Sequence, residues 1–478
     1  MLLVCLVVQT WSCVNPSEST QQAPNRDHIL LLTVDTLRSD HLSANGHPLP
    51  TTPSLDQLVR GGVFFPNAVA PVPRTTPSLA SVLTGAYPHG HGVRTLYDRL
   101  DISVTSLAEV LADRGYRTVA VVSNHVLVPE RGLGRGFEVY DFADDARHAE
   151  ATTEAALRHM ANLDRDEKIF LWVHYIDPHV PYFPPQQWID AFSPGYRGRY
   201  AEGFGTLAGG RGDRAYPPDL PKAEAVYRNP LTPEVNAHVR RLYAGDIRAM
   251  DEAIGELMEG LRTQIRNDWT VLFTSDHGES LGEHDFFYDH GDYVYQASLR
   301  VPLAFVLPPG DPLARSAVVE QPVSLVDILP TVLDLLGFEL PQVEAAQVEG
   351  KSLRPWFDGK AARPQAVFAE SGHSFYPHLV RRRVDHSVAG RFRAVILGDW
   401  KLIWTPGQES EHRYELYDLR QDPAEEVNLY RPEHPEVAVL QRALESWFRP
   451  DDLAVGGEDI QTLSPDDLER LRSLGYLP

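Results

Sequence analysis

Short apolar runs alternate with segments of helical periodicity along most of this chain. Five runs have the length and composition of buried strands, and they cover residues 28–34, 117–123, 169–175, 270–275 and 301–307. Between the third and fourth runs, residues 239–261 place apolar side chains at the spacing of one helix face. This alternation predicts an α/β fold with a mostly parallel sheet flanked by helices.

Polar, ionisable residues follow four of these runs directly. They are Asp35, the pair Asn124-His125, the segment from Asp177 to His179, and the pair Asp276-His277. In open α/β sheets, ligands bind beyond the carboxyl ends of the strands. One polar residue after a strand is usually only a turn, but four such ends together predict a shared site.

The pattern changes from about residue 366, where short strands with a tight turn at Gly398-Asp399 are expected. The expected strands lie in residues 366–370, 392–404 and 414–419, followed by helices at 434–448 and 464–473. The irregular segment 193–233 reads as a surface insertion that borders a substrate cleft. The predicted organisation is therefore a leader and linker (1–25), a main α/β domain (26–365) and a smaller C-terminal α+β subdomain (366–478).

The charge balance narrows the classes of partner. Of 478 residues, 44 are Lys or Arg and 66 are Asp or Glu, so the formal net charge is −22. Such a surface repels nucleic acid, and an anionic substrate needs a local positive centre. The two cysteines are Cys5 and Cys13, so the remaining chain has no disulfide and no thiol nucleophile.

The first thirteen residues, MLLVCLVVQTWSC, are apolar but short for a membrane span. They are typical of the core of a secretory signal, which predicts export to the periplasm. Lipidation at Cys13 would anchor the protein at the cell envelope, and that anchor is the membrane contact we expect. A simple apolar N-terminus is the alternative.

The stretch RTTPSLASVLTG (74–85) predicts a helix over 77–84, with Pro77 in its first turn and Thr75 or Thr76 as its cap. Its N-terminus would face Thr75 and favour an anion. Taken alone, the stretch is an ordinary helix start.

Asp35, Asp276 and His277 supply two carboxylates and an imidazole, a suitable ligand set for one divalent cation, which a Thr75 oxygen can complete. Such a cation would lower the pKa of the Thr75 hydroxyl and make it a nucleophile. His179 and His290 can then bind the anionic group or protonate the leaving oxygen. His125 and His284 are equally well explained as packed or surface histidines.

Six motifs in order resemble the sulfatases of the alkaline phosphatase superfamily over about residues 28–430. Besides Asp35 after its strand, they are T-x-P-S-x4-LTG from Thr75, Y-P-H-x-H-G-V (87–93), Y-x-D-P-H-x-P-Y (175–182), S-D-H-G-E-x-L-G-E-H (275–284) and R-V-P-L (300–303). The stretches D-W-K-L-I (399–403) and E-L-Y-D-L-x-x-D-P-x-E-x-x-N-L (415–429) are similar to the end of many sulfatases.

The resemblance implies an alkaline phosphatase-like α/β domain with a small C-terminal sheet domain, and hydrolysis of sulfate esters with one bound Ca²⁺. It implies that Asp35, Asp276 and His277 bind the metal, that position 75 is the nucleophile, and that His179 and His290 contact the sulfate. His125 stands where the family has a histidine, which implies a catalytic role for it as well. A histidine ligand would also suit Mn²⁺ or Zn²⁺.

The sequence departs from the family at the nucleophile. Sulfatases convert Cys or Ser to formylglycine, but this chain has Thr75, whose oxidation would give a ketone, so no formylglycine is expected. Leu79 replaces the family's Arg, Ser123 stands where the lost Lys is expected, and Thr36 replaces a second Asp.

Three hypotheses follow. The first is a metal-dependent sulfate-ester hydrolase with Thr75 as nucleophile, acting on a sulfated small molecule or glycan. The second is a phosphodiester or phosphonate-ester hydrolase, or a phosphoryl transferase, of the same superfamily. The third is a homologue that binds a sulfated or phosphorylated glycan without turnover.

Overall fold

The computed structural model describes residues 26–447, with gaps at 144–146, 162, 164–166, 209–212, 218, 266–267, 361–362, 373–390 and 406–412. The leader with Cys5 and Cys13, and the helix expected at 464–473, lie outside the described residues. Within the described ranges, no helix is both long and apolar enough to cross a membrane.

The core of the fold is a mixed, mostly parallel sheet, which confirms the predicted fold class. Its strand order is β12-β2-β11-β8-β1-β5-β3-β4, with β13 also paired to β2. The parallel centre consists of β8 (Trp269–Ser275), β1 (His28–Val34), β5 (Ile169–Tyr175), β3 (Arg117–Val122) and β4 (Val139–Phe142). Every residue of β1, β5 and β8 is buried, which explains why these strands read as continuous apolar runs.

The antiparallel part lies at one side of this sheet. β11 (Arg300–Val306) runs antiparallel to both β8 and β2 (Val63–Val69), and of these three strands β2 was not predicted. The short strands β12 (Ala317–Val318) and β13 (Val323–Ser324) pair with β2 in parallel. The predicted "mostly parallel" sheet is therefore correct, with β11 inserted as an antiparallel strand between β8 and β2.

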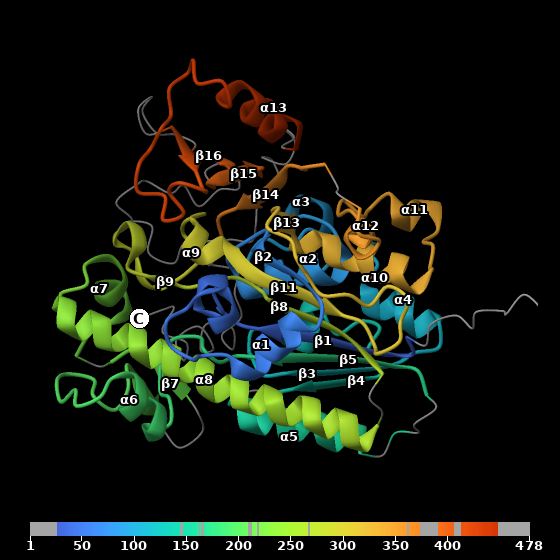
Figure 1. The fold of residues 1–478 in the computed structure, drawn as a ribbon, viewed down its shortest axis with the longest axis horizontal. Coiled ribbons are helices and arrows are strands. Elements are labelled where there is room, and N and C mark those ends of the chain that lie inside the picture. The colour runs from blue at the N-terminus through green and yellow to red at the C-terminus, as the bar shows by residue number, and fades with distance from the viewer. Residues whose placement is uncertain are drawn as a thin grey trace, which may run out of the picture.

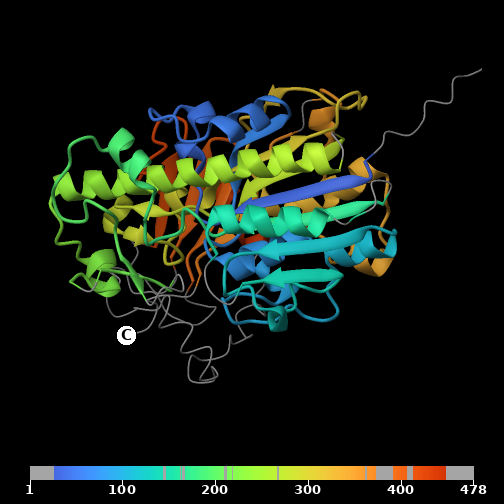
Figure 2. The ribbon, with the colours of Figure 1, turned by 90° about the horizontal axis from the view of Figure 1, so that it is seen from below.

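Helices cover both faces of the sheet (Figure 1). On one face lie α8 (Pro233–Gln264), α5 (Ala149–Met160) and α1 (Pro53–Arg60), with α6 (Gln186–Phe192) packed on α8. Figure 2 shows α8 and α5 running across the sheet. On the other face lie α2 (Thr75–Thr84), α4 (Leu107–Asp113), α10 (Ile328–Leu336) and α12 (Arg354–Phe357). The helix expected at 239–261 is the middle of α8, whose N-terminus is capped by Thr232.

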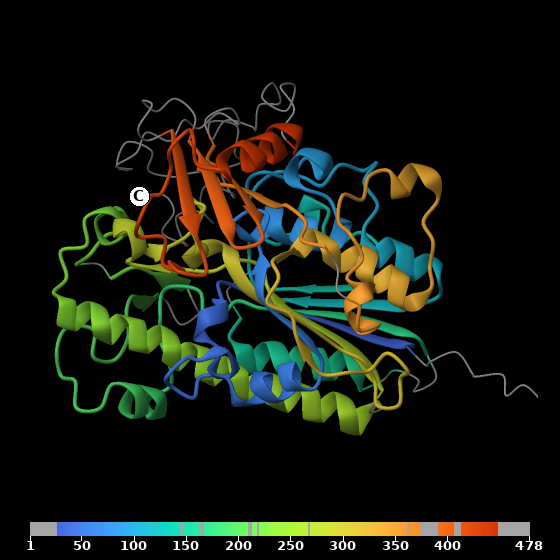
Figure 3. The same ribbon diagram turned by 45° about the horizontal axis from the view of Figure 1, so that its top comes forward.

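A second sheet follows near the C-terminus, as predicted (Figure 3). Its four antiparallel strands are β14 (Val367–Glu370), β15 (Arg393–Leu397), β16 (Trp400–Trp404) and β17 (Tyr414–Asp418). Helix α13 (Val437–Trp447) packs on this sheet through Val437, Leu440 and Leu444. The boundary at residue 366 stays a prediction.

The described part of the insertion 193–233 contains β6 (Thr206–Ala208), β7 (Asp213–Ala215) and α7 (Lys222–Tyr227). Helix α7 packs against β10 (Phe287–Asp289), which pairs with β9 (Ser280–Leu281). The insertion therefore reaches the segment that carries His290. The remaining short helices are α3 (Pro88–His91), α9 (Gln296–Leu299) and α11 (Gln342–Ala345).

Buried His91 links α3 to α2 and must be neutral in the native state. Its Nδ1 accepts a hydrogen bond from the Val93 N–H at 3.1 Å, so Nε2 carries the proton and donates to Ser81 Oγ at 2.9 Å. Burial, together with the nearby charge of Arg94, lowers the pKa of His91 to about 3. Below pH 6.5 the unfolded chain binds a proton that the native protein does not.

We therefore expect the free energy of unfolding to fall as pH falls from 6.5 toward 3, by up to about 1.4 kcal/mol per pH unit from this group. His91→Gln removes this term, so its stability deficit relative to wild type should shrink between pH 7 and pH 5 in urea titrations. Half-exposed His159→Gln is the control. Parallel stability curves for wild type and His91→Gln would show that His91 is not held neutral.

Candidate active site

Parallel register brings the polar strand ends to one edge of the sheet. Val34 of β1 lies opposite Tyr175 of β5 on one side and Ser275 of β8 on the other. The ladder continues one residue further, because the Asp35 N–H donates to Tyr175 O at 2.8 Å and the Asp276 N–H to Val34 O at 3.1 Å. Asp35 and the Asp276-His277 pair are therefore neighbours, as predicted.

Asp35, Asp276 and His277 form a fully buried group with the spacing of a metal site. One donor atom from each lies within 4.8 Å of the others. His277 Nε2 is 3.7 Å from Asp35 Oδ1 and 3.4 Å from Asp276 Oδ2. Neither of these carboxylate oxygens has a hydrogen-bond partner among the described residues. Two buried carboxylates are costly unless a cation balances them, so this donor set fits a divalent metal.

The local electrostatics shift the pKa values of Asp35 and Asp276 in opposite directions. Burial and the neighbouring Asp35 charge raise the pKa of Asp276 well above its ordinary value. Burial also opposes ionisation of Asp35, but the nearby rings of His174, His179 and His277 outweigh it and lower the pKa of Asp35 to about 2. Without a bound cation, one of the two acids is therefore held protonated.

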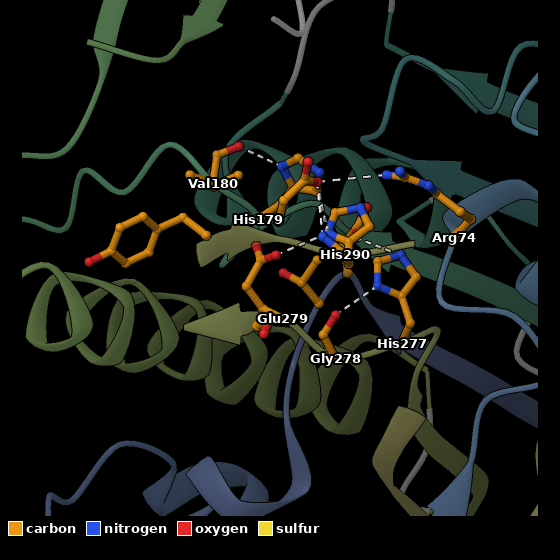
Figure 4. Close-up of polar contacts among 12 residues, drawn as sticks. Arg74, His179, Val180, His277, Gly278, Glu279 and His290 are labelled. Atoms are coloured by element: carbon orange, nitrogen blue, oxygen red, sulfur yellow. Dashed lines mark hydrogen bonds and ion pairs between the residues drawn. The ribbon is translucent and has the colours of Figure 1, made fainter. Parts of the chain in front are cut away.

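The His277 ring is oriented for metal binding. Its Nδ1 lies 3.0 Å from Gly278 O, a contact that assigns the ring proton to Nδ1 (Figure 4). The lone pair of Nε2 then faces the two carboxylates. Burial is the main cause that lowers the pKa of His277 to about 4, so the ring is neutral at neutral pH.

Thr75 lies beside this group, but the predicted start of its helix was wrong. α2 begins at Thr75 rather than Pro77, and extended Arg74 occupies the N-cap position. Neither Thr75 nor Thr76 caps the helix, because the Ser78 N–H already bonds to the Arg74 carbonyl at 3.1 Å. The Thr75 hydroxyl instead lies 3.5 Å from both Asp35 Oδ2 and His277 Nε2.

His179 and His290 meet at the same place, as predicted. Their ring centroids are 5.1 Å apart, and that of His290 is 4.2 Å from that of His277. His179 Nδ1 lies 2.5 Å from Val180 O, and His290 Nδ1 lies 3.0 Å from Glu279 Oε1 (Figure 4). His290 Nε2 has no hydrogen-bond partner in the described part of the chain, and burial with nearby His277 and Arg74 lowers the His290 pKa.

The loop after β3 contributes Asn124, one of the polar residues expected at the shared site, although no role was predicted for it. Asn124 Nδ2 donates to Asp35 Oδ2 at 2.5 Å. His125 is buried beside it, and its catalytic role stays a prediction. His284 stacks on Tyr295 with ring centroids 3.5 Å apart, a packing contact that accounts for it.

Other site residues were missed although some lie within the quoted motifs, because nothing in the sequence shows which side chains point into the site. His174 of β5 has Nε2 3.7 Å from Asp35 Oδ2, and its signal was a charged-type side chain within an apolar run. Glu279 is fully buried two residues after His277. Three more buried charged residues lie near His179 and His290 and shift their pKa values. They are Arg74, Lys222 and Asp289.

Comparison with known proteins decides the family. The family model "Sulfatase" matches residues 27–338, and the model "N-sulphoglucosamine sulphohydrolase, C-terminal" matches residues 282–449. The chain belongs to the sulfatase family. This sulfatase is a hydrolase of sulfate esters, and its buried Asp35, Asp276 and His277 can bind a metal, as is typical of sulfatases.

Individual relatives are distant but cover most of the sulfatase chain. It is 23% identical to an N-acetylglucosamine-6-O-sulfatase of Bacteroides thetaiotaomicron, over 90% of this chain and 87% of the relative. It is 25% identical to a choline-sulfatase of Rhizobium meliloti, over 88% and 85%.

Solved structures at similar distance share the fold. A protein in complex with its substrate D-glucosamine-2-N,6-O-disulfate matches with a TM-score of 0.69 and 20% identity, over 88% of this chain and 97% of that one. A phosphonate monoester hydrolase of Agrobacterium radiobacter matches with a TM-score of 0.70 and 21% identity, over 88% and 95%.

Proposed function

We propose that this sulfatase hydrolyses sulfate esters of sugars with Thr75 as its nucleophile. The main observation behind this proposal is the position of the Thr75 hydroxyl at the start of α2. It lies 3.5 Å from both Asp35 Oδ2 and His277 Nε2. Support for a sugar comes from two proteins to which the chain is similar, one named for N-acetylglucosamine-6-O-sulfate and one bound to a glucosamine disulfate.

Asp35, Asp276 and His277 would hold one divalent metal ion, with the Thr75 oxygen beside it. When bound, that ion would supply the positive charge that favours an ionised Thr75 hydroxyl and offsets the charge of the anionic ester. Ca²⁺ is the usual ion of the family that the sequence resembles, and the His277 nitrogen also suits Mn²⁺ or Zn²⁺.

The protein's own groups then carry the reaction. Thr75 Oγ forms a bond to sulfur while the bond from sulfur to the sugar oxygen breaks. His179 or His290, neutral before the reaction, accepts the proton that leaves Thr75 Oγ and passes it to the sugar oxygen. Water next attacks sulfur, the bond to Thr75 Oγ breaks, and a proton from the water restores the Thr75 hydroxyl as sulfate is released. The N–H groups of the first turn of α2 favour the negative charge on the sulfate.

This route does not use formylglycine, because a threonine side chain cannot be converted to an aldehyde hydrate. The second step therefore requires attack of water on sulfur, rather than elimination from a second hydroxyl. We propose that Thr75 stands at the position of the family's Cys or Ser.

Phosphoryl chemistry is the second candidate. A threonine hydroxyl also forms and releases phosphoryl esters, and a phosphonate or phosphodiester presents a tetrahedral anion of similar shape. The test gives wild type, reloaded with Ca²⁺, Mn²⁺ or Zn²⁺, an aryl sulfate, a matched aryl phosphodiester and an aryl phosphonate. We expect the largest kcat/KM for the sulfate; a larger value for either phosphorus ester would favour the second candidate, and no turnover of any ester would favour a binding protein.

His290 offers a separate prediction. Its Nε2 faces the site and its Nδ1 is held by Glu279, so His290→Gln should lower kcat for an aryl sulfate by roughly 10²- to 10⁴-fold. His284→Gln is the matched control, because His284 contacts Tyr295 instead and should change kcat little. Equal kcat values for His290→Gln and wild type would remove His290 from the reaction.

A further inference from the structure

Arg74, the residue directly before Thr75, is a buried cation without a role in the reaction described above. Its side chain is 2% exposed. Nη1 lies 3.7 Å from Asp289 Oδ1, and Nη2 lies 3.6 Å from Asp292 Oδ1. Both distances are within the range of ion pairs, so the two carboxylates balance the charge of buried Arg74.

Two glycines create the space that Arg74 occupies. A Cβ on Gly291 would lie 2.0 Å from Arg74 Nε, and a Cβ on Gly372 would lie 2.4 Å from Arg74 Cγ. The Gly372 N–H donates to Gly291 O at 2.7 Å, which joins the two segments over the side chain. Any larger residue at either position would displace the guanidinium.

The guanidinium lies toward the reacting groups. Figure 4 shows Arg74 extending toward His179 and His290. Its charge is one of the causes that lower the pKa values of His277 and His290, which agrees with this placement. In the stretch 74–85, Arg74 is the only basic residue, and it enters the site from the same backbone segment as Thr75.

A second buried cation supports the first. Lys222 of α7 is 5% exposed, and its Nζ lies 3.1 Å from Asp289 Oδ2. Asp289 thus stands between Lys222 and Arg74, with one oxygen toward each. The insertion 193–233 therefore fixes the carboxylate that orients Arg74.

We propose that Arg74 is a substrate-binding residue, whose guanidinium takes the non-bridging oxygens of the sulfate group while Thr75 faces the sulfur. Asp289 and Asp292 are positioning residues for Arg74, and Lys222 acts through Asp289. A planar guanidinium binds a tetrahedral oxyanion through paired N–H donors. This inference rests on the proposed function, since it names the residue that binds the sulfate group at the same site.

The test measures binding apart from turnover. In Arg74→Gln we expect KM for an aryl sulfate and the inhibition constant of inorganic sulfate to rise by roughly 10- to 100-fold, with Arg74→Lys between Gln and wild type. Gly372→Ala keeps the charge but crowds Arg74, and should weaken sulfate inhibition in the same direction. Arg26→Gln, which breaks the buried pair with Asp311, is the control for loss of an arginine ion pair.

Calorimetry with inorganic sulfate on the Thr75→Ala background separates this inference from the proposed function, because sulfate binding needs no nucleophile. If sulfate binds more weakly to the double variant than to Thr75→Ala alone, the role of Arg74 is supported. This holds even if Thr75→Ala remains active, a result that would contradict only the assignment of Thr75 as nucleophile. A lower melting temperature with unchanged sulfate affinity would make Arg74 structural and overturn the proposal. If Arg74→Gln does not fold, unchanged sulfate affinity in folded Gly372→Ala would overturn it as well.

Discussion

Thr75→Ala should lower kcat for an aryl sulfate by about 10³-fold or more, because it removes the atom that attacks sulfur. The hydroxyl lies 3.5 Å from Asp35 Oδ2 and from His277 Nε2, and it makes no capping bond that the helix would lose. The melting temperature should therefore change little. Initial rates at saturating substrate, with metal content measured for each preparation, give the comparison.

Two variants control this result. Thr75→Ser keeps a hydroxyl at the same position and should retain most of the activity. Thr76→Ala alters the next residue, whose hydroxyl bonds to Leu96 O at 3.2 Å, and should leave kcat near wild type. If Thr75→Ala turns over the sulfate as fast as Thr76→Ala, another group is the nucleophile.

The effect of Asp276→Asn on the melting temperature should have opposite signs with and without bound metal. Its Oδ1 accepts from the Thr36 and His277 N–H groups at 3.2 and 2.7 Å, bonds that an asparagine oxygen preserves. In chelator, the variant avoids the free-energy cost of taking up a proton at buried Asp276 beside ionised Asp35, so it should melt at or above the wild-type temperature. With added Ca²⁺, Mn²⁺ or Zn²⁺, wild type should gain stability by binding while the variant gains little.

The same preparations should show metal affinity lowered by at least about 100-fold and sulfate turnover lost. Asp141→Asn, whose carboxylate pairs with Arg147, is the control and should respond to metal as wild type does. A variant that is stabilised by metal as strongly as wild type would show that Asp276 is not a ligand.

Buried parallel strands were the easiest elements to predict, because both faces of β1, β5 and β8 are covered and their sequences are continuously apolar. Strand β2 was missed because its apolar run is interrupted by Pro66 and Asn67. The start of α2 was misplaced because a Thr-Thr-Pro sequence suggests a cap, whereas the extended backbone of Arg74 supplies the N-cap residue.

The site was predictable where polar residues directly follow strands. Asp35, Asp276 and His277 were found in this way because parallel register carries them to one edge. The roles of Asn124, Glu279 and Arg74 were not predicted, since they depend on side chains that meet from distant segments. Gly291 and Gly372 illustrate the reason, because only the folded structure shows that they make room for Arg74.

Rapid-quench analysis with a ³⁵S-labelled aryl sulfate tests the central claim, attack by Thr75, most directly. Within the first turnover, the label should appear on the peptide that contains Thr75 before free sulfate is released, and Thr75→Ala should carry none. Two results would contradict the account. One is label on a peptide that does not contain Thr75. The other is release of labelled sulfate by Thr75→Ala with the same time course as by wild type.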